Sequence, residues 1–180
     1  MRLTSTLCIL ATALAIAACS NSGDPVTPGA TATNTVKYSV NRGADQTTAY
    51  RWAEGSFNSD SSISVLGFSV QATRPDDDTE ADGMIIAFNG QSTGTSTVGI
   101  TATAVMYRDS SVYIGTGGTL VVSKYGNIGQ TIEGTFTARM ISFSFFGGPS
   151  DTLDVKEFRF SAKRIEDNQF NDIYEDEEVD

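Results

Sequence analysis

The sequence predicts an all-β fold, and three observations carry that prediction. Apolar and polar residues alternate with a period of two over much of the chain, most clearly over residues 132–140. Clusters of Gly, Asn, Asp and Pro separate these stretches at short intervals. No stretch beyond residue 34 combines a sustained helical period with capping residues. We expect an antiparallel β-sandwich of about nine strands, with a β-barrel as the alternative.

Residues 1–18 form a separate element that belongs to export. Arg2 supplies a basic start, and residues 7–18 are an apolar run that is too short to cross a bilayer as a helix. The sequence Ile16-Ala17-Ala18-Cys19 closes the run and resembles the cleavage box of bacterial lipoproteins. That resemblance implies a mature chain that begins at Cys19 and is acylated there. Because Ser20 and not Asp follows, it also implies sorting to the outer membrane.

Residues 19–34 follow as a lipid-anchored linker. They are small and polar, contain Pro and Gly, and show no hydrophobic period, which predicts a flexible tether. We place a single folded domain at residues 35–165, since about 130 residues can build one core without a disulfide.

Strands are expected in order along this domain. The expected strands lie at residues 35–40, 49–52, 63–71, 84–89, 101–107, 111–114, 119–124, 132–140 and 153–163. Gly115 to Gly118 is expected to be a turn, because four residues there include three glycines. The apolar phase changes between Val155 and Phe158, which predicts a β-bulge near Lys156.

The last element, residues 166–180, contains eight acidic residues and no basic one, which predicts a disordered acidic tail.

Composition excludes several function classes. The chain has no histidine, so Ser-His-Asp catalysis and the commonest zinc ligand are both absent. Cys8 is removed with the signal and Cys19 carries the lipid, which leaves no free thiol. Glu54, Asp109 and Glu133 are scattered and suggest no carboxylate pair for a hydrolase. With a net charge of −10 and no basic patch, nucleic acid is not an expected partner. We therefore expect no enzymatic activity.

Four segments resemble a group of uncharacterised exported bacterial lipoproteins. They are NGQSTGTSTVG (89–99), VYIGTGGTLVVSKYG (112–126), IEGTFTARM (132–140) and LDVKEFRFSAKR (153–164). The group shares G-T-x-T and I-x-G-T-F strands and a closing F-x-F strand. The resemblance implies an exported β-sandwich and no particular activity.

One candidate site is the acidic run that ends at Asp82. Calcium takes six to eight oxygen ligands, and closely spaced carboxylates can supply several of them. The predicted ligands are Asp76, Asp78, Glu80 and Asp82, although the spacing is not that of an EF-hand. A solvated loop without a metal is the alternative.

A second candidate is the pair Tyr50 and Trp52. Two residues apart on a strand, the rings would share a face and form a stacking platform for a sugar. Core packing is the alternative explanation for these rings.

The sequence thus predicts a lipid-anchored protein of the cell envelope with a non-catalytic binding or scaffolding role. Its partners would be the membrane, through Cys19, and an envelope protein or glycan. A calcium- or carbohydrate-binding module is the alternative, and no cofactor other than calcium is expected.

Overall fold

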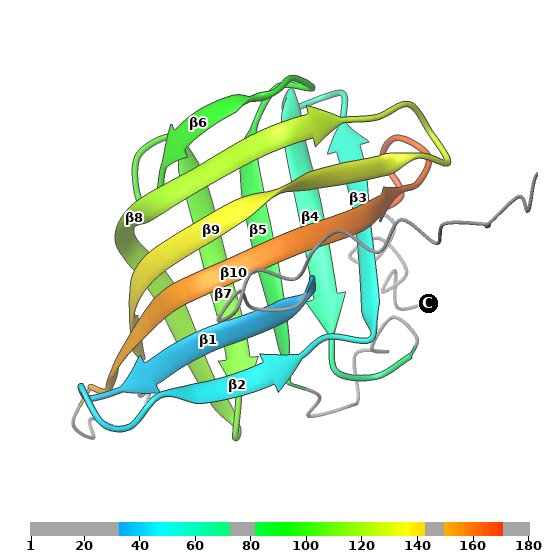
Figure 1. Ribbon diagram of the computed structural model, residues 1–180. Coiled ribbons are helices and arrows are strands. Elements are labelled where there is room, and N and C mark those ends of the chain that lie inside the picture. Colours follow the sequence, from blue (N-terminus) through cyan, green and yellow to red (C-terminus); the bar gives the residue numbers. More distant parts are fainter. Residues whose placement is uncertain (1–32, 73–81, 143–149, 171–180) are drawn as a thin grey trace, which may run out of the picture. The chain divides into compact units, whose positions relative to one another are not determined.

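The computed structural model describes residues 33–72, 82–142 and 150–170, and every helix or strand assigned within them is a β-strand. The predicted all-β class is confirmed, and the architecture is the barrel alternative (Figure 1). The strands are β1 (Thr35–Val40), β2 (Gln46–Ala49), β3 (Trp52–Asn58), β4 (Ile63–Ser69), β5 (Gly83–Asn89), β6 (Gly94–Thr97), β7 (Ala102–Arg108), β8 (Ser111–Tyr125), β9 (Thr131–Ser142) and β10 (Thr152–Arg164).

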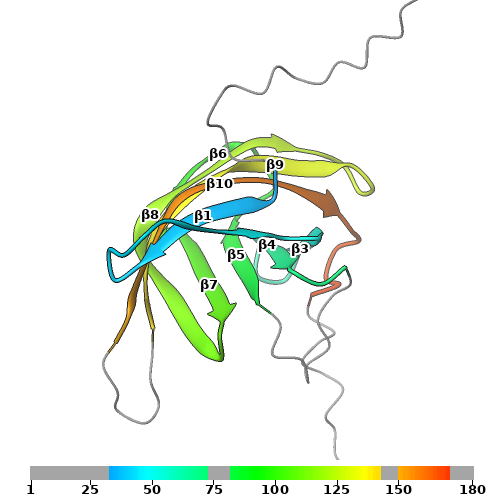
Figure 2. The same ribbon diagram turned by 60° about the horizontal axis from the view of Figure 1, so that its bottom comes forward.

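Seven of these strands form the closed barrel. Around the ring the order is β3, β4, β5, β7, β8, β9 and β10, after which β10 returns to β3. Strands β8, β9 and β10 cross over β3, β4, β5 and β7, with an interior between the two groups (Figures 1 and 2). Every ladder is antiparallel except the one between β10 and β3.

That parallel ladder is the seam of the barrel, and it is short. Only Lys163 and Arg164 of β10 pair with β3, opposite Glu54 and Gly55. The chain beyond β10 extends the seam, because the amide of Ile165 donates to Gly55 O (2.9 Å) and that of Asn168 to Phe57 O (2.8 Å). Residues 166–170, assigned from the sequence to the acidic tail, therefore continue along β3.

The long strands change partners along their length. Strand β8 pairs with β7 through residues 111–114 and with β6 through residues 119–122, while β9 follows its other edge. The predicted turn at Gly115 to Gly118 is wrong, because β8 runs through it with a shift in register. Gly118 has φ +130°, and a side chain there would collide with the backbone of Thr137 and Ala138. These glycines bend the strand and do not end it.

Strand β10 behaves in the same way. It pairs with β1 through residues 153–159 before it reaches β3, and its register shifts between Val155 and Phe158. The predicted bulge near Lys156 is thereby confirmed. Strands β1 and β2 form a hairpin that is attached to the barrel through β10.

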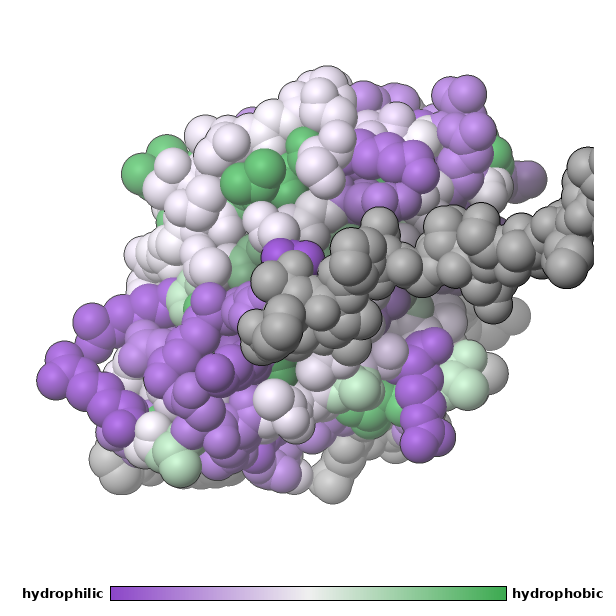
Figure 3. All heavy atoms as spheres, viewed as in Figure 1, coloured by the Kyte–Doolittle hydropathy of each residue, from purple (hydrophilic) through white to green (hydrophobic). Residues whose placement is uncertain are grey.

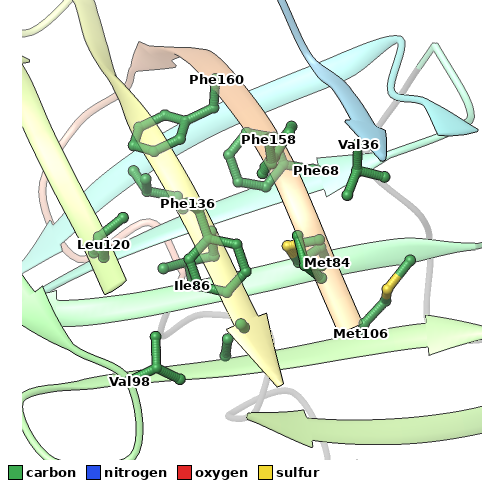
Figure 4. Packing of buried hydrophobic residues seen from close by; sticks show 14 of the residues in the cluster. Val36, Phe68, Met84, Ile86, Val98, Met106, Leu120, Phe136, Phe158 and Phe160 are labelled. Atoms are coloured by element: carbon green, nitrogen blue, oxygen red, sulfur yellow. The ribbon is translucent and has the colours of Figure 1, made fainter. Parts of the chain in front are cut away.

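Apolar side chains fill the barrel. The inward phase of β9, which includes Phe136 and Met140, is buried as its alternation predicts. Phe158 from β10 and Phe68 from β4 meet edge to face, with ring centroids 4.9 Å apart. Figure 4 shows these rings interleaved with Met84, Ile86 and Leu120 from the facing strands. The interior is therefore a packed core.

Arg164 closes the core at the seam end. Its side chain is buried, and its guanidinium lies 5.0 Å from the ring centroid of Tyr125. Nη1 donates to Gly126 O (3.3 Å), and Nη2 donates to Gln91 (3.2 Å) and to Asp167 (2.7 Å). One arginine thus ties together β10, the β8–β9 turn, the β5–β6 connection and the segment that follows β10.

Replacing Arg164 with Met should lower the free energy of unfolding by about 2–4 kcal/mol, because several acceptors lose their donor at once. Urea unfolding measures this change. Arg159→Met is the matched control, because Arg159 is half exposed and lies 3.8 Å from Glu157. That variant should stay within about 0.5 kcal/mol of the parent. Equal losses in both variants would contradict the role given to Arg164.

Candidate binding site at one end of the barrel

Four of the predicted site residues lie outside the described residues: Cys19, Asp76, Asp78 and Glu80. Asp82, the last predicted calcium ligand, directly precedes β5. Its Oδ1 accepts a hydrogen bond from the amide of Asp109 (3.1 Å). Within the described part of the chain, no three His, Cys, Asp or Glu side chains are grouped closely enough to hold a metal ion.

The structure does not bring Tyr50 and Trp52 together as a platform. Tyr50 is 5% exposed and packs against Phe68 and Phe158 in the core. Trp52 lies on the outer face, since its ring covers Gly67, which alternates with the inward-facing Leu66 and Phe68. Residues two apart share a face only within one strand. Tyr50 precedes β3, which begins at Trp52, so its side chain does not follow the inward and outward alternation of that strand. The core explanation applies to Tyr50, and the predicted stacking pair is not formed.

Tyr50 belongs instead to a polar cluster at the end of the barrel where β7 stops, at the bottom of Figure 1. Strand register places the ends of β1, β4, β7, β9 and the starts of β3, β5, β8, β10 at this level. The inner face of the β1–β2 hairpin contributes Tyr38, Gln46 and Thr48, and β7 contributes Arg108. We call this level of the barrel the Arg108 end.

Arg108 links the barrel to the hairpin. Its guanidinium lies 4.6 Å from the ring centroid of Tyr38, and Nη2 donates to Gln46 Oε1 (2.8 Å). Nε pairs with Asp109 (3.0 Å), whose side chain is 76% exposed while that of Arg108 is only 17% exposed. The Tyr38 hydroxyl also donates to Gln46 Oε1 (3.2 Å), so this one amide oxygen serves two donors.

Among the described residues, two buried donors at the Arg108 end have no acceptor. They are Nη1 of Arg108 and the hydroxyl of Tyr50. A buried polar group without a partner costs about 1–3 kcal/mol, so native structures hold few of them. Neither neighbouring acceptor serves these donors, since Gln46 Oε1 already takes two hydrogen bonds and Asp109 pairs with Nε.

Charge also gathers at this end. Burial raises the pKa of the Tyr50 hydroxyl, and the Asp82 carboxylate raises it further, while Arg108 opposes both. Burial likewise raises the pKa of Tyr113, with Asp151 adding to the effect and Arg108 again opposing it. Both phenols therefore stay protonated at neutral pH and act as hydrogen-bond donors.

Ion pairs hold the outer side of the hairpin. Asp45 pairs with Lys37 (3.1 Å) and with Lys156 of β10. The Lys156 and Lys37 ammonium groups keep the pKa of Asp45 below its usual value. Hydrophilic residues cover this part of the surface, at the lower left of Figure 3. The hairpin is thus charged outside and carries tyrosine and amide groups inside.

The opposite end of the barrel offers a comparison. There Tyr125 shares a hydrogen bond with Ser64 (2.7 Å), and Arg164 leaves only its Nε without a partner. Sequence reasoning overlooked both arginines, although a signal was present. Each lies two residues beyond a buried apolar residue of the same phase, Met106 before Arg108 and Ala162 before Arg164. An arginine in an inward series predicts a buried guanidinium.

No protein-family model matches this chain, and no curated protein and no solved structure matches it. Within residues 33–72, 82–142 and 150–170 there is no helix that could span a membrane.

Two tyrosine variants test whether the tyrosine hydroxyl lacks a hydrogen-bond partner at the Arg108 end and has one at the opposite end. Tyr50→Phe removes a hydroxyl that has no partner, so the free energy of unfolding should rise by about 1 kcal/mol. Tyr125→Phe removes a hydroxyl bonded to Ser64, so the free energy of unfolding should fall by about 1 kcal/mol. Urea unfolding of both variants gives the two values. A loss of stability in Tyr50→Phe would mean that its hydroxyl has a partner after all.

Proposed function

We propose that this protein is a lipid-anchored, non-catalytic binding protein of the cell envelope and that its ligand binds at the Arg108 end of the barrel. The observation that carries the proposal is the pair of buried donors, Arg108 Nη1 and the Tyr50 hydroxyl, which lack an acceptor. The core fills the rest of the interior, so the proposal places the ligand at the end itself.

The energetic argument concerns the cost of these two donors. A tyrosine hydroxyl and a guanidinium N–H that are buried without acceptors destabilise the folded state. Positions that break the rules of stable packing are where functional groups are found in proteins. An oxygen atom of a ligand would satisfy both donors and offset their cost in the bound state.

Access would come from the β1–β2 hairpin. Strand β2 has only β1 as a strand neighbour, and its four residues are exposed or half-buried. Across the barrel end, Gln46 meets Arg108 through a single hydrogen bond, beside the Tyr38 ring. A strand with so few contacts is among the first to open locally. Outward movement of β2 would uncover Arg108 and then Tyr50.

The anchor rests on the sequence around Cys19, and the proposed tether would join the barrel at Asn34, which is bonded to β10 and Tyr50. Asn34 exchanges two side-chain hydrogen bonds with Ser161 of β10 (2.9 and 3.1 Å). Its backbone amide donates to Arg159 O (2.7 Å), and its carbonyl accepts from Tyr50 (2.8 Å). A pull on the tether would therefore be borne by β10. The 15 residues from Ser20 to Asn34 span at most about 50 Å.

The lipid anchor is tested by labelling. Cells that express the chain and are fed an alkyne-tagged palmitate should incorporate the label, and Cys19→Ala should abolish it and release the protein from the membrane fraction. Cys8→Ala is the matched control, and it should keep both the label and the membrane association. Label that persists in Cys19→Ala would refute the anchor.

Calcium binding is a second candidate, favoured by the proximity of Asp82 and Asp109. The other predicted ligands, Asp76, Asp78 and Glu80, precede Asp82 within six residues of the sequence and lie outside the described residues. If calcium binds there, millimolar calcium should raise the melting temperature, and a chelator should reverse the rise. Asp82→Asn should remove the response, whereas Asp60→Asn, at the opposite end, should keep it. An unchanged melting temperature would end this candidate.

A further inference from the structure

The outer surface of β4, β5 and β7 is apolar. These strands lie behind β8, β9 and β10 in the view of Figure 1. Gly67, Ile85, Val105 and Ile114 are direct cross-strand neighbours, and each alternates with buried core residues, so the row points outward. Together with their outward neighbours they form a group that we call the apolar face: Val65, Gly67, Ile85, Ala87, Val105, Tyr107 and Ile114.

An apolar outer surface is unusual for antiparallel strands. A strand with one face in water alternates apolar and polar residues, as β9 and β10 do with Glu133, Arg139, Arg159 and Lys163 at their outer positions. Strands β4 and β5 carry apolar residues in both phases and no charged residue. That composition is typical of strands that are covered on both faces.

The apolar face is nevertheless partly open. The side chains of Tyr107 and Ile114 are 44% and 36% exposed. A shallow hollow of about 110 Å³ adjoins the face, with Ala87 and the 82% exposed Ile100 in its lining. On the other side, Glu54 of β3 pairs with Gly67, and Lys163 of β10 pairs with Glu54. Charge therefore begins where the apolar face ends.

The C-terminal end of the described chain reaches the start of this row. Ser56 of β3 donates to Glu166 O (2.7 Å), so the segment after β10 passes along β3. Phe170 then meets Trp52 edge to face, with ring centroids 6.5 Å apart. A Cβ atom added to Gly67 would lie 3.0 Å from the Trp52 ring and 3.2 Å from the Phe170 ring. Both rings therefore cover Gly67, and the row continues from there to Ile85 and Val105.

We propose that residues 171–174, which lie outside the described residues, cover the apolar face and that Ile173 and Tyr174 pack on Ile85 and Val105. Phe170, Ile173 and Tyr174 have the spacing that places side chains on one side of a helical turn. Such side chains lie about 5–6 Å apart, which matches the separation of about 4.8 Å between neighbouring strands. This inference does not depend on the binding site proposed at the Arg108 end.

The position of Phe170 favours this occupant over a second copy of the chain or a lipid surface. Because Phe170 already lies at Gly67, the next four residues are held beside the face at an effective concentration of about millimolar or more. A second copy would have to pack around Phe170 and Trp52. Residues 175–178 are all acidic, so an anionic lipid surface would repel this end of the chain.

Photo-crosslinking of the full chain in intact cells tests the proposal. With benzoylphenylalanine in place of Tyr174, mass spectrometry should find an adduct within the same chain on β4, β5 or β7. The same probe in place of Val179 is the control and should give no adduct on these strands. Ile85→Lys should lower the Tyr174 adduct by about tenfold, because docking would bury an ammonium group. Thr135→Lys, at an exposed outer position of β9, should leave it unchanged.

Thermal unfolding gives a second measurement. Ile173→Ser should lower the melting temperature by about 3 °C, because it removes apolar burial, whereas Val179→Ser should not. Neither variant alters a strand, so both should fold even if Ile85→Lys does not. An adduct on a second copy or on a phospholipid would refute the proposal. So would the absence of an adduct, or equal melting temperatures of the two serine variants.

Discussion

Closure of the sheet is the constraint on which the rest of this structure depends. Because the ring has seven strands, an odd number, strands of alternating direction close it only if one ladder is parallel, and here that ladder has two residue pairs, between β10 and β3. The short seam leaves the first half of β10 free to pair with β1. Because β3 pairs only with the C-terminal end of β10, the β1–β2 hairpin occupies the N-terminal part of β10, which lies at the Arg108 end. Arg164 and the segment after it reinforce the seam with side-chain and backbone hydrogen bonds.

The two ends of the barrel contain the same pair of residue types but differ in how many donors have acceptors. Each has an arginine stacked on a tyrosine, Arg164 on Tyr125 and Arg108 on Tyr38. At the seam, Nη1 and Nη2 of Arg164 have acceptors and only Nε lacks one, so most of these interactions stabilise the fold. At the Arg108 end, two donors remain without acceptors among the described residues, and the covering strand β2 has only β1 as a strand neighbour. More of the hydrogen-bonding capacity is satisfied where the barrel closes than at the Arg108 end, which is why the proposed binding site is placed there.

Much of the fold was predictable, and particular residues show why the rest was not. Alternation located β1, β4, β5, β7 and β9 because each has one buried and one outer face. It missed β6, whose residues Gly94–Thr97 carry no apolar side chain, and it divided β8 at glycines that only bend it. A sandwich and a barrel give the same alternation of apolar and polar residues. They differ in the pairing of β10 with β3, which joins residues far apart in the sequence and leaves no local signal. The sequence could not show that Arg108 Nη1 and the Tyr50 hydroxyl lack acceptors, because that depends on three-dimensional packing. It did indicate that Arg108 lies in the same inward series as Met106.

The most direct test is a high-resolution structure of the protein purified from its own membranes, with the surroundings of Tyr50 resolved. We predict density that does not belong to the protein within hydrogen-bond distance of both the Tyr50 hydroxyl and Arg108 Nη1, with β2 displaced outward to admit it. Protein acceptors bonded to both atoms, with the barrel end closed, would contradict the assignment of this end as the binding site.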